Sequence, residues 1–154
     1  MQDHYDIEPS EDGLTYSFVT KSNLKYLLAL TTYQLGDVKA FSLSLYPELV
    51  NDVPREFDYR IKCTVVEIIG KILKEESNTV FYVCDIEDNK SDQRQLVFEY
   101  WYQKAKDLHD YIKKYNHTTV SENGYVVNSS LLYNFHNPLS QYIVDKFIEE
   151  MSIL

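Results

Sequence analysis

A short apolar run near the middle of the chain constrains the fold most. Residues 80–84 read Val-Phe-Tyr-Val-Cys without a polar interruption, and Asp85 ends the run. The run is long enough for a strand and too short for a helix, and it is rich in β-branched and aromatic residues. Because no polar residue alternates with the apolar ones, both faces of the strand should be buried. The run therefore predicts an inner strand of a sheet that is covered by helices.

Three strands and a helix are predicted before this run. Alternating or apolar patterns, separated by short polar turns, predict an antiparallel set of strands at residues 14–19, 24–33 and 38–45. A helix is expected from Pro54 to Glu76, because proline is tolerated in a first turn and apolar residues follow at spacings of three and four. These residues form one stripe, which consists of Phe57, Ile61, Val65, Ile68, Ile69 and Ile72.

A second helix, a hairpin and a last helix are predicted after the run. The helix is expected over residues 91–115, with Ile112 and Tyr115 at the end of its apolar stripe. Asn123-Gly124 predicts a hairpin between strands at 117–122 and 125–133, because a type I′ turn needs positive φ at both central positions. Asn137-Pro138 is expected to open the last helix, whose apolar face is Leu139, Ile143, Phe147 and Met151.

These elements follow one another in the order β-β-β-α-β-α-β-β-α. The third strand, the first helix and the run at 79–85 can form a right-handed crossover between parallel strands, while short turns elsewhere require antiparallel pairs. We therefore predict an α+β fold with a mixed sheet. Residues 13–154 suit a single domain, and residues 1–12, which are polar and acidic, are expected to form a flexible tail.

The charge distribution argues against several classes of protein. The chain carries 24 acidic residues against 15 lysines and arginines, a formal net charge of −9, and its first twelve residues contain acids but no lysine or arginine. A nucleic-acid-binding protein would show a basic face. No apolar run reaches the roughly 18 residues of a membrane span, and the first residues do not resemble a signal peptide. The sequence therefore predicts a cytoplasmic protein that binds neither nucleic acid nor a membrane.

The cysteines and histidines give no indication of a metal site. Cys63 and Cys84 both lie in apolar segments, and the four histidines are scattered without a helical i, i+4 pair. We expect neither a disulfide framework nor a bound metal ion.

One polar group follows the apolar run, where ligands often bind in mixed sheets. It consists of Asp85, Asp88 and Arg94. These residues could contact a ligand or a partner, or an Asp–Arg pair and a helix cap could simply fix the turn. With a divalent cation, the two carboxylates would also suit a phosphate-handling enzyme.

A longer pattern around this group resembles a family of small bacterial proteins of unknown function. Its centre is residues 81–85, followed by Asp88-Asn89, Arg94 and residues 96–102. The pattern extends over about residues 14–105 through further matching positions, namely Tyr16, Phe18, Thr20, Asp58, Ile61, Thr64, Val65, Ile68 and Ile69. This resemblance implies membership of a family and brings no activity with it.

The order of elements is similar to that of the core of the general N-acetyltransferase superfamily. The similarity implies an acetyltransferase-like sandwich, in which a glycine-rich loop at the start of the first core helix binds the pyrophosphate of acetyl-CoA. The matching stretch, residues 54–60, contains no glycine, and its Glu56 and Asp58 would repel phosphate. The candidate cofactor contacts in it are Arg55, Tyr59 and Arg60.

The general acid of that superfamily is often a tyrosine early in the second helix. Phe98 occupies the matching position here and has no proton to give, whereas Tyr100 and Tyr102 match only after a register shift. The resemblance therefore implies a cofactor chemistry that is absent or much altered.

Two functions from different classes follow from these patterns. The first is a non-enzymatic protein-interaction or regulatory domain without a cofactor. Its partner would be another protein, and some of the 14 tyrosines could form a binding face on the C-terminal hairpin or on the first three strands. The alternative is a divergent acyl-CoA-dependent N-acyltransferase, with acetyl-CoA held in a cleft between splayed central strands.

Overall fold

The computed structural model describes residues 4–48, 59–83, 102–107, 109–120 and 122–152. The described strands form one sheet in the order β1-β2-β3-β4-β5-β7-β6. The strands are β1 (Glu8–Pro9), β2 (Thr15–Val19), β3 (Lys25–Leu35), β4 (Val38–Pro47), β5 (Thr79–Val83), β6 (Ile112–Val120) and β7 (Val126–Asn134). The helices are α1 (Tyr59–Lys74) and α3 (Ser140–Met151), with a further helical segment at 102–107.

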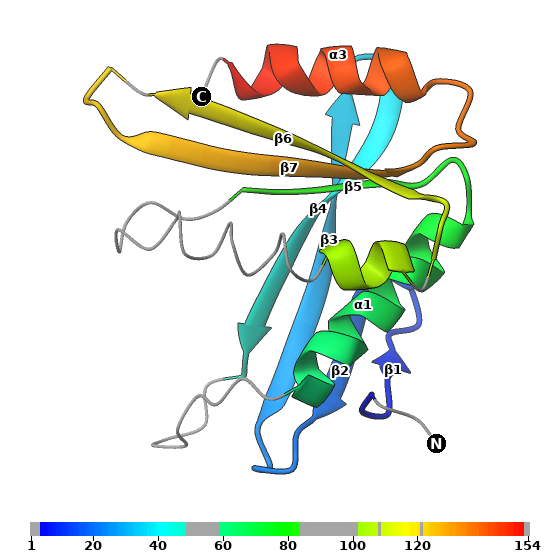
Figure 1. The fold of residues 1–154 in the computed structure, drawn as a ribbon. Helices are drawn as coiled ribbons and strands as arrows, with labels where there is room; N and C mark the ends of the chain where they lie inside the picture. The colour runs from blue at the N-terminus through cyan, green and yellow to red at the C-terminus, as the bar shows by residue number, and fades with distance from the viewer. Residues whose placement is uncertain (1–3, 49–58, 84–101, 108, 121, 153–154) are drawn as a thin grey trace.

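The helices lie on both faces of the sheet, so the fold is α+β with a mixed sheet, as predicted (Figure 1). On the face that α1 and residues 102–107 cover, Tyr26 and Leu28 of β3 pack with Ile61 and Ile68 of the helix. On the opposite face, Phe147 of α3 packs in a second apolar cluster that reaches both β3 and β5. We call these the α1 face and the α3 face.

Strand β5 is the inner strand that its apolar run predicts. It lies between β4 and β7, and Val80, Phe81 and Tyr82 are buried. Its pairing with β4 is parallel, which confirms the predicted crossover, and the other pairs in the sheet are antiparallel. The parallel contact joins only two positions, Phe41 to Val80 and Ser42 to Phe81, after which the two strands diverge (Figure 1).

The predicted stripe of the first helix is also confirmed. Within the described part of α1, Ile61, Val65, Ile68, Ile69 and Ile72 are all buried. Residues 54–58 lie outside the described residues, and the helix ends at Lys74.

The second helix was predicted too long. Ile112 and Tyr115, placed on its apolar stripe, lie on β6, opposite Asn134 and Leu131 of β7. Their spacing of three is compatible with a helix, but nine consecutive partners on β7 give this segment a cross-strand ladder instead. Residues 112–115 were therefore predicted with the period of a helix, whereas they have the period of a strand.

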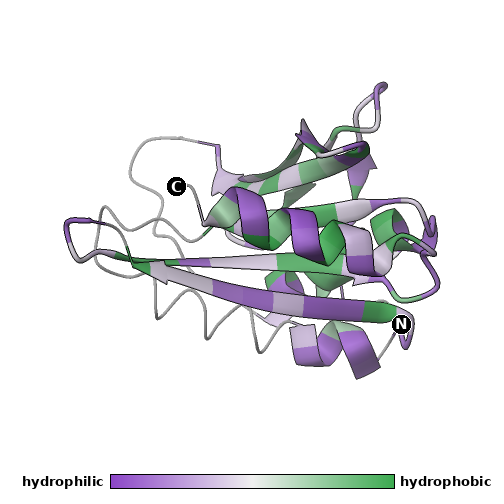
Figure 2. Ribbon diagram, turned by 90° about the horizontal axis from the view of Figure 1, so that it is seen from above, coloured by the Kyte–Doolittle hydropathy of each residue, from purple (hydrophilic) through white to green (hydrophobic). Residues whose placement is uncertain are grey.

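The hairpin of β6 and β7 forms with a longer loop than predicted. Val120 is the last partner of Val126, so five residues connect the strands, and Gly124 has a φ of 81° while no positive φ occurs at Asn123. A type I′ turn needs positive φ at both positions, so that turn type was wrong. In Figure 2 the hairpin projects beyond the rest of the described sheet, with hydrophobic residues next to the turn.

Residues 4–12 do not form the flexible tail that their acidity predicted. Tyr5 is only 4% exposed and stacks on Phe18, which in turn stacks on Tyr26. Its backbone N–H donates to the Thr64 hydroxyl at 2.8 Å. Apolar contacts therefore hold this segment against the domain despite its charge.

Candidate functional site

Most of the candidate residues from the sequence cannot be placed. Asp85, Asp88, Arg94 and Arg55 lie outside the described residues, as do Phe98 and Tyr100. Tyr59, Arg60 and Tyr102 are described.

Tyr59 and Arg60 lie at the start of the described part of α1. The first described turn contains no acidic residue. Arg60 is already engaged, because its guanidinium lies 4.1 Å from the centre of the Tyr5 ring and donates to the His4 carbonyl at 3.3 Å. The Lys62 ammonium lies 4.6 Å from the ring of Tyr59. Both cations at this end of the described helix are therefore engaged by aromatic rings, Arg60 by Tyr5 and Lys62 by Tyr59.

The divergence of β4 and β5 produces a wedge in the sheet. Beyond Ser42, β4 continues to Pro47 with β3 as its partner, while β5 continues to Val83 with β7 as its partner. The acetyltransferase resemblance implied a cofactor between strands that splay in this way.

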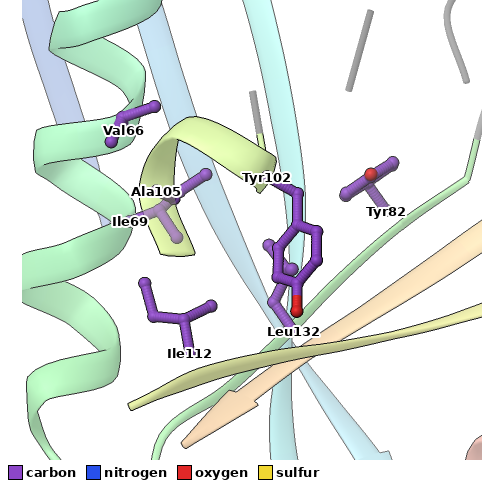
Figure 3. Close-up of a pocket in the computed structure, with 7 residues that line it drawn as sticks. All are labelled: Val66, Ile69, Tyr82, Tyr102, Ala105, Ile112 and Leu132. Carbon is purple, nitrogen blue, oxygen red and sulfur yellow. The ribbon is translucent and has the colours of Figure 1, made fainter. Parts of the chain in front are cut away.

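A small cavity lies between α1, residues 102–107 and the α1 face of the sheet (Figure 3). Its volume is about 20 Å³, enough for about one water molecule and far below the several hundred Å³ of a typical ligand site. Its lining is mostly apolar and consists of Val66, Ile69, Tyr82, Tyr102, Ala105, Ile112 and Leu132. As lined by the described residues, the cavity is therefore too small for a substrate.

Tyr102 lines this cavity, where a register shift would have made it the general acid. In Figure 3 its hydroxyl points toward Leu132. The ammonium of Lys114 lies 5.5 Å from the centre of the Tyr102 ring and 6.0 Å from that of Tyr82. The Lys114 ammonium thus lies near two phenol rings on the α1 face of the sheet.

A ladder of polar side chains connects β6 and β7. Thr118 donates to the Asn128 side-chain oxygen at 3.0 Å, and Ser130 donates to the Asn116 side-chain oxygen at 2.7 Å. The period of two in the strands puts all four residues on the α1 face. These bonds satisfy the buried Asn128 and Ser130 and fix the register of the hairpin. Sequence analysis did not predict this ladder, because its partners come from two strands whose register local patterns do not specify.

The end of the hairpin exposes large apolar side chains. Val120, Tyr125 and Val126 are 64%, 52% and 41% exposed, and the two valines are cross-strand partners. We call these three residues the hairpin tip. An exposed tyrosine on this hairpin was predicted, whereas the valines were assigned no role.

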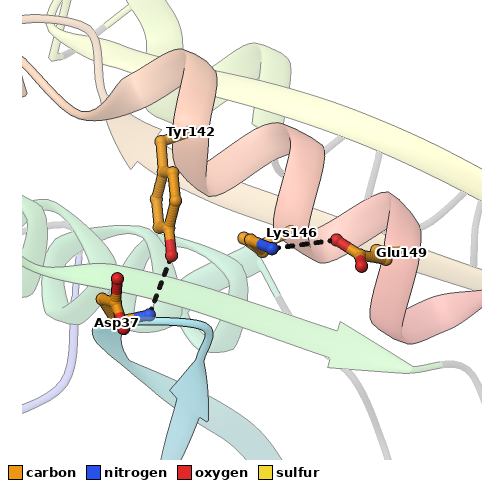
Figure 4. A network of polar contacts seen from close by, with 4 residues as sticks. All are labelled: Asp37, Tyr142, Lys146 and Glu149. Carbon is orange, nitrogen blue, oxygen red and sulfur yellow. Dashed lines mark hydrogen bonds and ion pairs between the residues drawn. The ribbon is translucent and has the colours of Figure 1, made fainter.

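One hydrogen bond joins α3 to the β3–β4 turn, and one ion pair lies within α3 (Figure 4). The Tyr142 hydroxyl accepts the backbone N–H of Asp37 at 2.9 Å, and Lys146 pairs with Glu149 at 3.2 Å. The hydrogen bond to Glu149 raises the pKa of Lys146. These contacts stabilise the scaffold and do not assemble a reactive group.

The described part of the chain contains neither a metal-binding cluster nor a membrane-spanning helix. No group of three His, Cys, Asp or Glu residues there is arranged to hold a metal ion. None of the helices described has the length and apolar character needed to span a bilayer.

Comparison with known proteins identifies a family, but that family has no known function. The model of a family of unknown function, DUF6169, matches residues 57–149, well over half of the chain. The match runs from α1 to α3 and includes the polar group at 85–94, but not the strands β1–β4. No curated protein and no solved structure matches.

Proposed function

Because this chain belongs to DUF6169, a family of unknown function, we propose its role from its surface: a non-enzymatic domain that binds another protein through the hairpin tip. The observation that carries the proposal is the exposure of Val120, Tyr125 and Val126 together at the end of a projecting hairpin. An exposed apolar group on a projecting element is a common feature of protein-binding sites.

The chemistry of the tip supports this proposal. Tyrosine is enriched among residues that dominate binding energy, since it buries a large apolar area and keeps a polar end. The ladder of Thr118, Asn128, Asn116 and Ser130 stabilises the hairpin behind the tip, so little conformational entropy is lost on binding.

A photo-cross-linking experiment tests the proposal. The protein carries a photoreactive phenylalanine analogue in place of Tyr125, and the control carries it in place of Lys21, which is exposed on the β2–β3 turn. We expect an adduct with a specific protein from position 125 in the cells of origin. The double variant Val120→Ser with Val126→Thr should reduce it at least tenfold without lowering the melting temperature by more than a few degrees. Equal labelling from both positions would refute the proposal.

A second candidate is supported by the wedge between β4 and β5. An acetyltransferase-like scaffold would hold the pantetheine arm of acetyl-CoA between these strands. On this proposal the chain is a divergent acyl-CoA-dependent N-acyltransferase.

A thermal-shift titration with acetyl-CoA and free CoA tests the second candidate. A ligand at one hundred times its Kd stabilises the folded state by about 2.7 kcal/mol. For a chain of this size, that corresponds to a rise of roughly 5–10 °C in Tm. A saturable rise would support the acyltransferase. An unchanged Tm at millimolar ligand would exclude it and leave the protein-binding proposal standing.

A further inference from the structure

We infer that the outer edge of β6 binds an extended, acidic segment of the partner protein as an additional strand. This inference rests on the proposed function, because it gives the partner's chemistry at the same hairpin. Addition of a strand to a sheet edge is a general mode of peptide recognition, in which main-chain hydrogen bonds give affinity and side chains give specificity.

The register of the hairpin shows which backbone groups face outward. β6 is the last strand of the described sheet. Phe135 N–H donates to Tyr111 C=O at 2.9 Å, and these two residues continue the register that pairs Ile112 with Asn134. In an antiparallel pair, bonded positions alternate with non-bonded ones. Odd-numbered residues of β6 therefore bond to β7, and even-numbered residues turn their N–H and C=O groups to the outer edge.

A second bond confirms this assignment. Ile112 N–H donates to His109 C=O at 3.2 Å, away from β7. At the other end of the strand, the same alternation directs the N–H and C=O groups of Thr118 and Val120 outward. These two residues supply the core of the proposed docking edge, next to the hairpin tip.

The two edge strands of the described sheet, β1 and β6, differ in how well they are protected against pairing with a further strand. Strand β1 consists of two residues, and one of them is Pro9, which has no N–H to donate. A short edge strand with a proline is a usual way to prevent further strand pairing. Strand β6 has nine residues, no proline and an unbroken register with β7. A partner strand is therefore expected at β6 rather than at β1.

The charge of β6 indicates an acidic partner. The strand carries Lys113 and Lys114 and no acidic residue, in a chain whose net charge is −9. Alternation places Lys113 on the α3 face, where it lies 5.9 Å from the centre of the Phe135 ring. Lys114 lies on the α1 face, near the Tyr82 and Tyr102 rings, so β6 carries one cation on each face. Lysines at an edge discourage neutral or basic strands, whereas carboxylates on the incoming strand gain an attraction that also accelerates association.

Fluorescent octapeptides provide the first test. One peptide alternates valine with glutamate, and its control alternates valine with lysine. Fluorescence anisotropy should show saturable binding of the acidic peptide only, and added salt should weaken it because exposed charges are screened within about 10 Å at 0.1 M. Hydrogen exchange gives a direct readout. The amides of Thr118 and Val120 should become protected on binding, while those of His117 and Thr119, bonded to β7, change little.

Two matched pairs of variants locate the binding edge. Thr118→Pro removes an outward N–H and leaves the backbone hydrogen bonds to β7 intact, so it should weaken peptide binding at least tenfold relative to Thr118→Ala. Both variants lose the hydroxyl that donates to Asn128, so the comparison isolates the loss of the backbone N–H. Lys113→Glu should weaken it about tenfold at low salt, whereas Lys21→Glu, the same charge change on a distant turn, should leave it unchanged. If Thr118→Pro fails to fold, as judged by its melting curve, the comparison of Lys113→Glu with Lys21→Glu decides whether the peptide binds at β6.

The outcomes separate this inference from the proposed function. Failure of the acidic peptide to bind, or equal binding of both peptides, overturns the inference, and so does a free protein that is already a dimer with Thr118 and Val120 protected. A specific adduct from position 125 would then still support a protein-binding hairpin. Loss of both the adduct and the peptide binding would refute the inference and the proposed function together.

Discussion

Tyr33 and Glu150 show how one side-chain contact connects β3 to the C-terminal helix α3. The Tyr33 hydroxyl donates to a Glu150 carboxylate oxygen at 3.0 Å, across more than a hundred residues of sequence. This hydrogen bond, followed by burial and by the charge of Glu150, raises the pKa of Tyr33 above 10.0. Because the folded pKa is the higher one, the contact stabilises the fold below about pH 10 and is lost as pH rises through the folded pKa.

A titration of the tyrosine rings tests this contact. We expect Glu150→Ala to lower the pKa of Tyr33 toward its ordinary value, because both the hydrogen bond and the charge disappear. Glu149→Ala is the control, since Glu149 pairs with Lys146 instead. NMR chemical shifts against pH, with the Tyr33→Phe variant for assignment, give the measurement. Equal pKa values in the wild type and in Glu150→Ala would contradict the contact.

Tyr5 gives a second prediction at the scale of one residue. Its ring lies between the Arg60 guanidinium and Phe18 and is almost fully buried. Tyr5→Ala should lower the free energy of unfolding by about 3–5 kcal/mol, as other large aromatic-to-alanine changes in cores do. Tyr5→Phe should cost about 1 kcal/mol, because it removes only the hydroxyl that accepts the Lys21 N–H. Urea denaturation measures both, and a cost below about 1 kcal/mol for Tyr5→Ala would mean a loose N-terminal segment.

The sequence predicted residues well where a single pattern was decisive. The apolar stripe of α1 and the run of β5 each identified buried side chains correctly. The role of Tyr5 could not be predicted, because its neighbours Asp6 and Glu8 give the segment the composition of a solvated tail, and its packing partners lie far along the chain. Exposure of Val120 and Val126 depends on where the hairpin ends, which local composition does not specify.

At the scale of elements, α1 and the segment before β6 meet at a glycine. A β-carbon on Gly70 would lie 2.5 Å from Nε2 of His109, and the Tyr111 hydroxyl donates to the Gly70 carbonyl at 2.8 Å. Glycine is unfavourable inside a helix by about 1 kcal/mol relative to alanine, so close packing explains its presence here.

A double-mutant cycle tests that explanation. Gly70→Ala alone should destabilise the protein despite its better helix propensity, because the His109 ring must move. In a His109→Ala background, the same change should instead be neutral or stabilise by up to about 1 kcal/mol. Chemical denaturation of the four proteins gives the coupling energy. A destabilisation by Gly70→Ala that persists without the histidine ring would show that another contact requires the glycine.

The end of the second helix could not be predicted from the sequence, and the reason lies in the elements themselves. Ile112 and Tyr115 are spaced for a helix, yet Ile112, Lys114 and Asn116 also alternate with residues on the other face of a strand. Only the long pairing with β7 distinguishes the strand from the helix, and that pairing involves residues 126–134. Local periodicity does not include this information.

On the scale of the whole molecule, the sheet consists of two halves that share little hydrogen bonding. Strands β1–β4 and strands β5, β7 and β6 are joined at two parallel positions. The α3 cluster supplies much of the remaining connection, since it combines Leu35 and Ala40 of the first half with Phe81 and Leu131 of the second. Phe147 lies within this cluster, fully buried, with its ring centre 5.9 Å from that of Phe81.

Removal of Phe147 should therefore loosen the junction as well as lower stability. Phe147→Ala is expected to reduce the free energy of unfolding by about 3–5 kcal/mol. Native-state hydrogen exchange should accelerate more at Asp37 and Leu131, beneath α3, than at Phe18 in the α1 layer, because the junction opens locally before the molecule unfolds. Asp145→Ala, an exposed change on the same helix, should alter neither quantity. Uniform acceleration at all three amides would instead show that the two half-sheets unfold as one cooperative unit, held together by α1 alone.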